Sequence, residues 1–216
     1  MSDYEEQERA LDEEHLPFKQ GVVGSSPTGP SNTVYTYNRG NCLCFCYDMV
    51  MKKVIVVDDK DNPIDLKTYS ELAYEDIYRV SALWLTDAKT DDILMTQRKL
   101  TKHHDPGKWM AAASGTIEEG ETYDENIVHE IEEEIGLYDL QLTKGPKEFT
   151  DDGQHKYFVQ WYLATTDKDT AVIQIQEEEV EAHAWVPKQQ LLSELAEDPT
   201  KFVPSFKKDL KALTII

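Results

Sequence analysis

The chain has 216 residues, with 42 acidic and 22 basic side chains and a formal net charge of −20 at pH 7. This charge argues against binding nucleic acid or an anionic membrane through bulk electrostatics, although it permits a small anionic substrate held through a metal. The length allows one domain of ordinary size, and no apolar run approaches the roughly 20 residues of a membrane span. The N-terminus is acidic and lacks the apolar core of a signal peptide.

The first fifty residues differ in composition from the rest. Residues 1–20 are acidic, and residues 21–32 are rich in turn-forming glycine, proline and serine. We expect residues 1–50 to be a disordered leader and residues 51–216 to form the folded domain. A second hypothesis is that the reading frame starts too early. Gly24-Ser25-Ser26-Pro27 is what GGT-TCG-AGT-CCC would encode, which resembles the T-arm of a transfer RNA gene, and Met51 or Met49 would be the true start. A native peptide from residues 1–40 would exclude this hypothesis.

All three cysteines lie in one short run, at Cys42, Cys44 and Cys46. The rest of the chain therefore has no disulfide framework, which favours a reducing compartment, and we expect a cytoplasmic protein. Alternate thiols could bind a soft metal. Incidental burial in an apolar patch is the simpler interpretation.

From Met51 onward the sequence predicts a mixture of strands and helices. We expect strands at residues 54–57, 79–85, 93–98, 156–164, 172–176 and 182–185. Turns are expected at 58–63 and 87–92, a helix or irregular crossing at 69–78, a loop at 101–108, a helix at 188–197 and a last helix after Pro204. This order indicates an α/β fold, an α/β/α sandwich around a mixed β-sheet.

Residues 115–137 are the most informative segment, Gly-Thr-Ile-Glu-Glu-Gly-Glu-Thr-Tyr-Asp-Glu-Asn-Ile-Val-His-Glu-Ile-Glu-Glu-Glu-Ile-Gly-Leu. Thr122 begins a Thr-x-x-Glu capping box, and Gly136 can take the left-handed conformation that ends a helix. The isoleucines at every fourth position form an apolar stripe, at Ile127, Ile131 and Ile135. The segment therefore predicts a loop, a capped helix and a glycine stop.

Glu130, Glu133 and Glu134 are spaced i, i+3, i+4 and share one helix face. Two like charges about 4 Å apart repel by roughly 4 kcal/mol at an effective dielectric of 20, so the cluster is costly unless a cation occupies it. Oxygen ligands suit magnesium or manganese rather than zinc. The spacing alone also allows a solvated acidic face.

The segment resembles the Nudix box, the signature of the Nudix hydrolase family, written G-x5-E-x7-R-E-U-x-E-E-x-G-U with U aliphatic. The matching positions are Gly115, Glu121, Glu130, Ile131, Glu133, Glu134, Gly136 and Leu137. The arginine of the motif is His129 here. In the family that arginine holds the catalytic loop through a glutamate, and a histidine can do part of this.

The resemblance implies the Nudix fold and a divalent-metal-dependent hydrolase that uses Mg²⁺ or Mn²⁺. Such an enzyme cleaves a diphosphate linkage in a nucleoside diphosphate derivative or related organic pyrophosphate by attack of water at phosphorus. Glu121 would brace the loop or bind a further ion through water. Many relatives are dimers, so a homodimer is one option. The implied metal ligands are Glu130, Glu133, Glu134 and a backbone carbonyl of Ser114 or Gly115.

Candidates outside the box rest on weaker signals. Arg98 and Lys99 end a predicted strand and could clamp phosphate oxygens, or they could form an exposed charge pair. Trp109 could stack on a base or pack against the loop. His103 and His104 could contact phosphate or transfer protons, or could be solvated.

A late acidic loop at residues 177–179 supplies the candidate general base. Nudix enzymes often recruit a glutamate from such a loop, and Glu178 is the residue we choose. An acidic turn without a catalytic role is the alternative.

Three short stretches resemble a Nudix subgroup related to isopentenyl-diphosphate isomerase. They are residues 54–64, residues 185–187 and residues 202–206. That isomerase uses an active-site cysteine to transfer a proton, and no cysteine follows Met51, so hydrolysis is favoured. A Nudix module that senses a nucleotide without cleaving it is a third option, which the intact acidic core disfavours. The sequence does not indicate which substrate is used.

Overall fold

The computed structural model describes residues 52–216 in full and the backbone alone of residues 34–38 and 43–47. The chain divides into two units, residues 1–50 and 51–216. In the first unit, β1 (Val34–Asn38) pairs with β2 (Leu43–Tyr47) as an antiparallel hairpin. The expectations for the leader, for its start and for the cysteine side chains lie outside the described residues.

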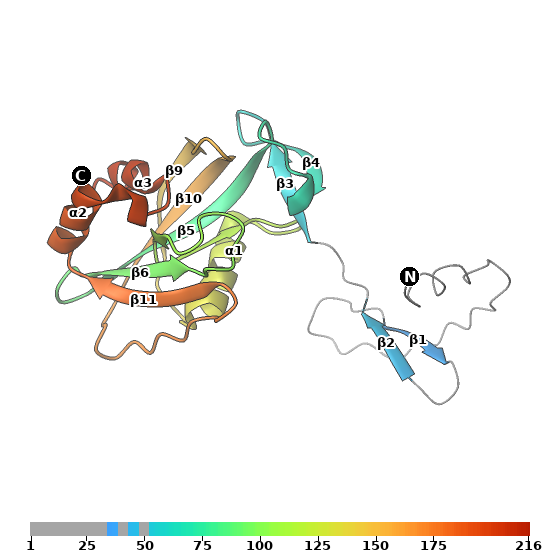
Figure 1. Ribbon diagram of the computed structural model, residues 1–216, viewed down its shortest axis with the longest axis horizontal. Coiled ribbons are helices and arrows are strands. Elements are labelled where there is room, and N and C mark those ends of the chain that lie inside the picture. Colours follow the sequence, from blue (N-terminus) through green and yellow to red (C-terminus); the bar gives the residue numbers. More distant parts are fainter. Residues whose placement is uncertain (1–33, 39–42, 48–51) are drawn as a thin grey trace, which may run out of the picture. The chain divides into compact units, whose positions relative to one another are not determined.

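Residues 52–216 contain a nine-stranded mixed sheet (Figure 1). Its main order is β11-β6-β5-β10-β9, in which β5 and β10 run parallel and the other pairs are antiparallel. β3 pairs with β4 and β5, β7 pairs with β6, and β8 pairs with β5. The strands are β3 (Lys53–Val57), β4 (Pro63–Thr68), β5 (Ile77–Asp87), β6 (Ile93–Arg98), β7 (Trp109–Met110), β8 (Ala113–Thr116), β9 (Thr143–Asp151), β10 (Lys156–Thr166) and β11 (Val180–Val186).

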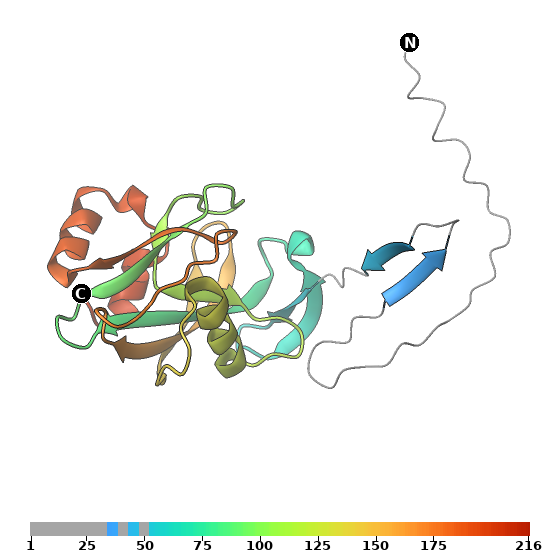
Figure 2. The ribbon, with the colours of Figure 1, turned by 90° about the horizontal axis from the view of Figure 1, so that it is seen from below.

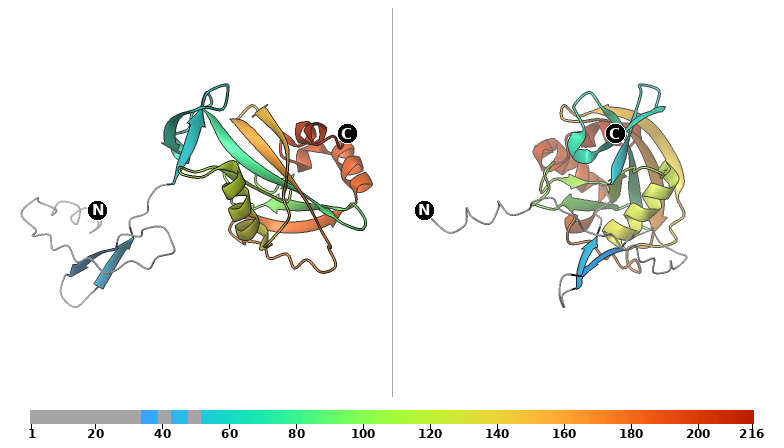
Figure 3. Two further views of the ribbon diagram at one scale, coloured as in Figure 1. Left: turned by 180° about the vertical axis from the view of Figure 1, so that it is seen from behind. Right: turned by 90° about the vertical axis from the view of Figure 1, so that its right-hand side faces the viewer.

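Helices cover both faces of this sheet. Alternation along β5 assigns the faces, because successive strand residues point to opposite sides. Leu83 belongs to a core cluster with Ile127 of α1, whereas Trp84 belongs to one with Phe206 of α3. Figures 2 and 3 show α1 and the C-terminal helices on opposite sides of the strands. The helical segments are η1 (Tyr69–Glu71), α1 (Tyr123–Glu130), the π-helical turn η2 (Ile131–Ile135), α2 (Lys188–Glu197), η3 (Pro199–Lys201) and α3 (Phe206–Ala212). This arrangement confirms the predicted sandwich.

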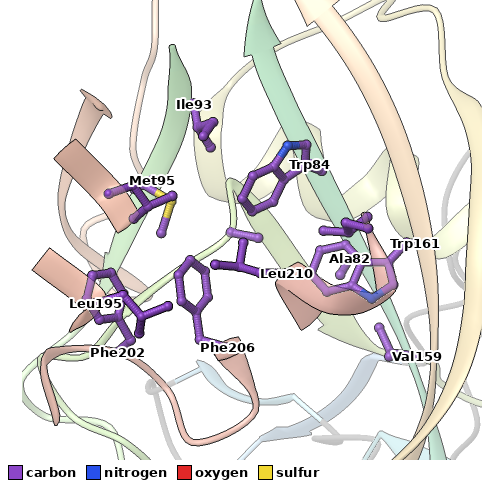
Figure 4. Close-up of a cluster of buried hydrophobic side chains, with 13 residues drawn as sticks. Ala82, Trp84, Ile93, Met95, Val159, Trp161, Leu195, Phe202, Phe206 and Leu210 are labelled. Carbon is purple, nitrogen blue, oxygen red and sulfur yellow. The ribbon is translucent and has the colours of Figure 1, made fainter. Parts of the chain in front are cut away.

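The C-terminal segment closes one of the two cores. In Figure 4, Phe206 lies between Leu195 and Phe202 on one side and Trp161 on the other. The rings of Phe202 and Phe206 stack with centroids 4.8 Å apart and planes 10° apart. Such pairs contribute about 0.5–1.5 kcal/mol beyond the apolar area that they bury. This packing fixes the start of α3 against β5 and β10.

The predicted motif helix begins and ends as its sequence indicates. Thr122 N donates to the Glu125 carboxylate at 2.9 Å, and Glu125 N donates to Thr122 Oγ1 at 3.3 Å, which completes the capping box. Gly136 has φ +66°, and a Cβ there would lie 2.8 Å from Gln174 Cβ. The sequence did not predict that the last five residues, Ile131–Ile135, form a π-helical turn.

The predicted strand at residues 172–176 is wrong, because this segment has no regular structure. Its backbone amides donate hydrogen bonds to the motif helix instead of to a neighbouring strand. Gln174 N donates to Ile135 O at 2.9 Å, and Gln176 N donates to Glu134 O at 3.1 Å. The segment therefore pairs with carbonyls that a helix end leaves free.

Four strands of residues 52–216 were not predicted, β4, β7, β8 and β9, and residues 69–78 resolve into η1 followed by the start of β5. β4 and β9 are largely exposed and carry many polar residues, so they lack a clear apolar alternation. β7 and β8 are only two and four residues long, too short for a periodic pattern. Among the described residues, no helix is long and apolar enough to cross a membrane.

Candidate active site

A cavity of about 780 Å³ lies over β5 and β10 and reaches the motif helix. Its floor includes Val80, Ala82, Val159 and Trp161. The volume is within the roughly 300–1,000 Å³ of ligand pockets. Trp161 Nε1 is the one buried side-chain polar atom without a hydrogen-bond partner in the described part of the chain. All the metal ligands that the resemblance implies line the cavity, at Ser114, Gly115, Glu130, Glu133 and Glu134.

Gly115 lets the motif helix approach the sheet. It lies on β8, in register with Ser81 of β5. A Cβ atom at Gly115 would lie 1.8 Å from Glu130 Oε1, which is far too close for two non-bonded atoms. Glycine at this position therefore decides where the Glu130 carboxylate can lie.

The three glutamates differ in burial: Glu134 is buried, Glu130 is half-buried and Glu133 is exposed. Glu134 is 8% exposed and accepts a hydrogen bond from Ser114 N at 3.0 Å. Burial, with a further contribution from Glu130, raises the pKa of Glu134 to about 8. Burial, with a contribution from Glu133, raises the pKa of Glu130 to about 7. Both shifts mean that the ionised cluster is costly without a compensating charge.

Asn126 connects this cluster to the sheet, and the sequence did not single it out. It is 2% exposed. Its Oδ1 accepts from Ser81 Oγ at 2.6 Å, and its Nδ2 donates to Glu121 Oε2 at 3.0 Å and to Glu130 Oε1 at 3.4 Å. The sequence could have indicated Asn126, because it lies four residues before Glu130 and so shares a helix face with it.

His129 contacts Glu121, another residue of the motif. Its Nδ1 lies 3.1 Å from Glu121 Oε1. The other carboxylate oxygen of Glu121 accepts from Glu118 N at 3.1 Å, so Glu121 ties the loop to the helix. The structure therefore places His129 where it can hold Glu121.

Of the two predicted phosphate-binding cations, the structure brings only Arg98 to the cavity. Arg98 Nε donates to His104 O at 3.0 Å, and Nη1 lies 3.7 Å from Met110 Sδ. Within residues 52–216 no carboxylate forms an ion pair with Arg98. Lys99 lies outside the cavity lining and pairs with Glu181 at 3.3 Å.

Trp109 does not line the cavity. It packs against the core cluster that contains Phe202 and forms a β-bridge with that residue. The structure therefore gives Trp109 a packing contact and not a stacking position.

The late acidic loop contributes a different residue from the one chosen. Glu178 is exposed and does not line the cavity, whereas Glu179 does. Glu179 pairs with Lys102, and its backbone oxygen accepts from Lys99 N at 2.9 Å. The paired backbone directs Glu179 toward the cavity in place of its neighbour.

The histidine loop also reaches the cavity. His103 and His104 both line it, and His104 Nδ1 lies 3.1 Å from His155 Nε2. Burial, and then the neighbouring His155 and Arg98, lower the pKa of His104. This favours a neutral His104 ring.

The donor set fits a hard divalent cation by its chemistry, since all side-chain donors are carboxylate oxygens. Among the described residues, no three Asp, Glu, His or Cys side chains converge closely enough to form a ready-made ion site. Glu133 is exposed, so its side chain is free to turn toward Glu130 and Glu134. A bound cation would offset both the cost of burying these carboxylates and the repulsion between them, which together raise the pKa values of Glu130 and Glu134.

A family model described as the NUDIX domain matches residues 77–206. The chain belongs to the Nudix family. The match spans β5 to the start of α3, and so contains the motif helix and nearly all of the cavity lining.

Two related sequences align with this chain over most of their own length. An uncharacterized Nudix hydrolase of Pseudomonas aeruginosa is 26% identical over 159 residues, which is 74% of this chain and 89% of the relative. An isopentenyl-diphosphate Delta-isomerase of Salmonella heidelberg is 27% identical over 172 residues, 72% of this chain and 88% of the relative. The chain is therefore similar both to a protein named as a Nudix hydrolase and to one named as an isomerase.

Solved structures agree on the fold. The Deinococcus radiodurans protein DR0079 matches with a TM-score of 0.58 at 19% identity, covering 67% of this chain and 89% of that one. A bifunctional NMN adenylyltransferase/ADP ribose pyrophosphatase of Francisella tularensis matches with a TM-score of 0.50 at 18% identity, covering 68% of this chain and 43% of that one. At these identities the likeness concerns the fold alone.

Proposed function

We propose that this Nudix protein is a divalent-metal-dependent pyrophosphohydrolase acting on a nucleoside diphosphate derivative or a related organic diphosphate. The observation that carries the proposal is that the half-buried Glu130, the buried Glu134 and Arg98 all line one cavity. A cation held by the glutamates and the guanidinium would together offset the charge of a diphosphate.

Glu130, Glu133 and Glu134 would hold Mg²⁺ or Mn²⁺, with a backbone carbonyl of Ser114 or Gly115 as a further ligand. When bound, the ion supplies Lewis-acid stabilisation and activates water for attack at phosphorus. The amide of Ser114 orients Glu134 through their 3.0 Å hydrogen bond. Gly115 leaves the space that the Glu130 carboxylate occupies.

Arg98 would bind the phosphate oxygens. Its Nε donates a hydrogen bond to the backbone oxygen of His104, which fixes the side chain. The guanidinium has no carboxylate partner among residues 52–216 and so can accept a phosphate as its counter-ion. Lys99 and Trp109 are less suited to substrate binding, because the structure places both outside the cavity lining.

Glu179 replaces Glu178 as our candidate general base. It lines the cavity, as does the amide-bearing Gln176 beside it. Its carboxylate now pairs with Lys102, an interaction that a substrate phosphate would compete for. Displacement of Lys102 toward phosphate would free Glu179 to accept a proton from water.

The second candidate is an isopentenyl-diphosphate isomerase-like activity, which the Salmonella relative favours. No cysteine follows Met51 to transfer the proton, so we rank it below hydrolysis. A nucleotide-sensing module without turnover ranks third. The cytoplasmic location and the homodimer stay predictions that cell fractionation and light scattering can test.

The test is release of phosphate or nucleotide from a panel of nucleoside diphosphate derivatives and isopentenyl diphosphate, with Mg²⁺ or Mn²⁺. Glu133→Gln and Glu134→Gln should each lower kcat by at least about a hundredfold, more than the 10–100-fold typical of losing an outer partner of a metal ligand. Glu132→Gln is the matched control, because Glu132 is exposed on the same turn. Isomerisation without cleavage would select the second candidate, and nucleotide binding without turnover would select the third.

A further inference from the structure

One end of the cavity is lined by aromatic rings brought together from η1, β5, β10 and two loops. Neighbouring ring centroids lie between 4.3 and 6.2 Å apart. We call this the aromatic end. Its rings belong to Tyr69, Tyr78, His104, His155 and Tyr157, all of which line the cavity.

The aromatic end is separated from the glutamates along β5. Tyr78 and Ala82 both line the cavity, and Ala82 is in register with Ser114, whose amide binds Glu134. Four residues along a strand span about 13 Å. The aromatic end is therefore placed to contact the organic part of a ligand whose diphosphate lies at the glutamates.

A buried carboxyl group belongs to this end. Asp209 of α3 is 6% exposed, lines the cavity and accepts a hydrogen bond from Ser205 Oγ at 2.8 Å. Within residues 52–216 it has no ion-pair partner. Burial raises its pKa to about 7. A buried carboxylate without a cation is costly, so a cationic ligand would be stabilised here.

None of the lysine and arginine side chains that line the cavity pairs with Asp209. Lys52 pairs with Glu118 at 3.0 Å and Lys102 pairs with Glu179. Arg98 lies close enough to Glu134 to lower its pKa against the effect of burial. The aromatic end thus presents ring faces and carboxyl oxygens, and Asp152 adds a second carboxyl group to the lining.

We propose that the aromatic end binds a positively charged organic group of the substrate, an amine or a quaternary ammonium, with Asp209 as its counter-ion. Ring faces attract a cation through their quadrupole, most strongly where water is excluded. A wholly apolar prenyl chain would bury Asp209 further and bring it no counter-charge. The inference rests on the proposed function, since it names the class of the group attached to the diphosphate.

The experiment compares two diphosphate esters that differ in charge alone. The probes are cytidine diphosphate esterified with choline and with its uncharged isostere 3,3-dimethylbutanol. We expect wild-type kcat/KM to favour the choline ester by about tenfold. Asp209→Asn should reduce this preference to within about twofold, because it removes the negative charge and keeps the size of the side chain. Glu197→Gln, which removes an exposed charge from α2, should keep the full preference.

Binding measured by calorimetry with phosphocholine and 3,3-dimethylbutyl phosphate gives a second readout that needs no turnover. Equal binding and equal turnover of each pair by the wild type would overturn the inference, as would a preference that Asp209→Asn leaves intact. Metal-dependent cleavage of both esters at equal rates would overturn the inference and keep the proposed function. Failure to cleave any diphosphate, together with selective binding of phosphocholine, would overturn the proposed function and keep the cation-binding site.

Discussion

His129 Nδ1 lies 3.1 Å from Glu121 Oε1, eight residues away along the chain. The contact joins the second turn of α1 to the loop before it, and the other oxygen of Glu121 holds Glu118 N. A histidine therefore makes here the contact that the Nudix motif assigns to arginine.

His129→Ala should lower kcat/KM by about three- to tenfold, because one hydrogen bond worth about 1 kcal/mol no longer holds the loop. His129→Arg should retain or exceed wild-type activity, since a guanidinium can bond both the carboxylate and a neighbour. Steady-state kinetics with Mg²⁺ checks both. The added effect of Glu121→Gln on the His129→Ala background should be smaller than its effect alone, and full additivity would contradict the coupling.

Gly115→Ala should destabilise the protein by about 1–3 kcal/mol and weaken metal binding, because the new methyl group would occupy the position of the Glu130 carboxylate. The free energy of unfolding, measured in urea without metal, checks the first part. On a Glu130→Ala background the same glycine substitution should cost much less. An equal cost on both backgrounds would show that the strain lies elsewhere.

Asn126→Asp should be more damaging than Asn126→Ala. Both remove the amide donor to Glu121 and Glu130, but Asp places a buried carboxyl group directly beside these two carboxyl groups. We expect a loss of roughly 2–3 kcal/mol in the free energy of unfolding at pH 8 for Asp and a smaller loss for Ala. Equal losses would mean that charge plays no part in the role of Asn126.

Asp209→Asn should stabilise the protein at pH 8 and have little effect at pH 4. The folded pKa, about 7, is above the ordinary value of 3.8, so the folded state holds an extra proton between these values. Stability from the neutral carboxyl group is fully present below about pH 4 and is lost as the pH rises through 7. The variant avoids this loss, which we place at roughly 2–4 kcal/mol. Urea unfolding at both pH values measures it, and equal stability at pH 8 would contradict the assignment.

The sequence predicted those parts of the fold that depend on neighbours along the chain. The capping box at Thr122, the strand at 93–98 and the helix at 188–197 follow from local spacing of polar and apolar residues. The edge strands β4 and β9 were missed, because partly exposed strands need no strict alternation. The apolar run at Val172 resembled a strand, but its neighbours' amides bond the motif helix.

The candidate site divides in the same way. The glutamates were singled out by their spacing on one helix together with their match to the Nudix box. Asn126 and Asp209 were not singled out, and Glu178 was chosen over Glu179, because the importance of these residues depends on which atoms the folded chain brings beside them. The aromatic end joins residues between 69 and 209, a separation that no local pattern reports.

The π-helical turn at Ile131–Ile135 changes what the motif spacing means in three dimensions. In a uniform α-helix each residue advances by about 100°, so positions 0, 3 and 4 form a compact arc. Here Glu130 precedes the wider turn, whereas Glu133 and Glu134 lie within it, so their angular separation is that of a helix with mixed pitch. Transplanting the three glutamates onto a regular α-helix would copy the letters of the motif and misplace its oxygen atoms.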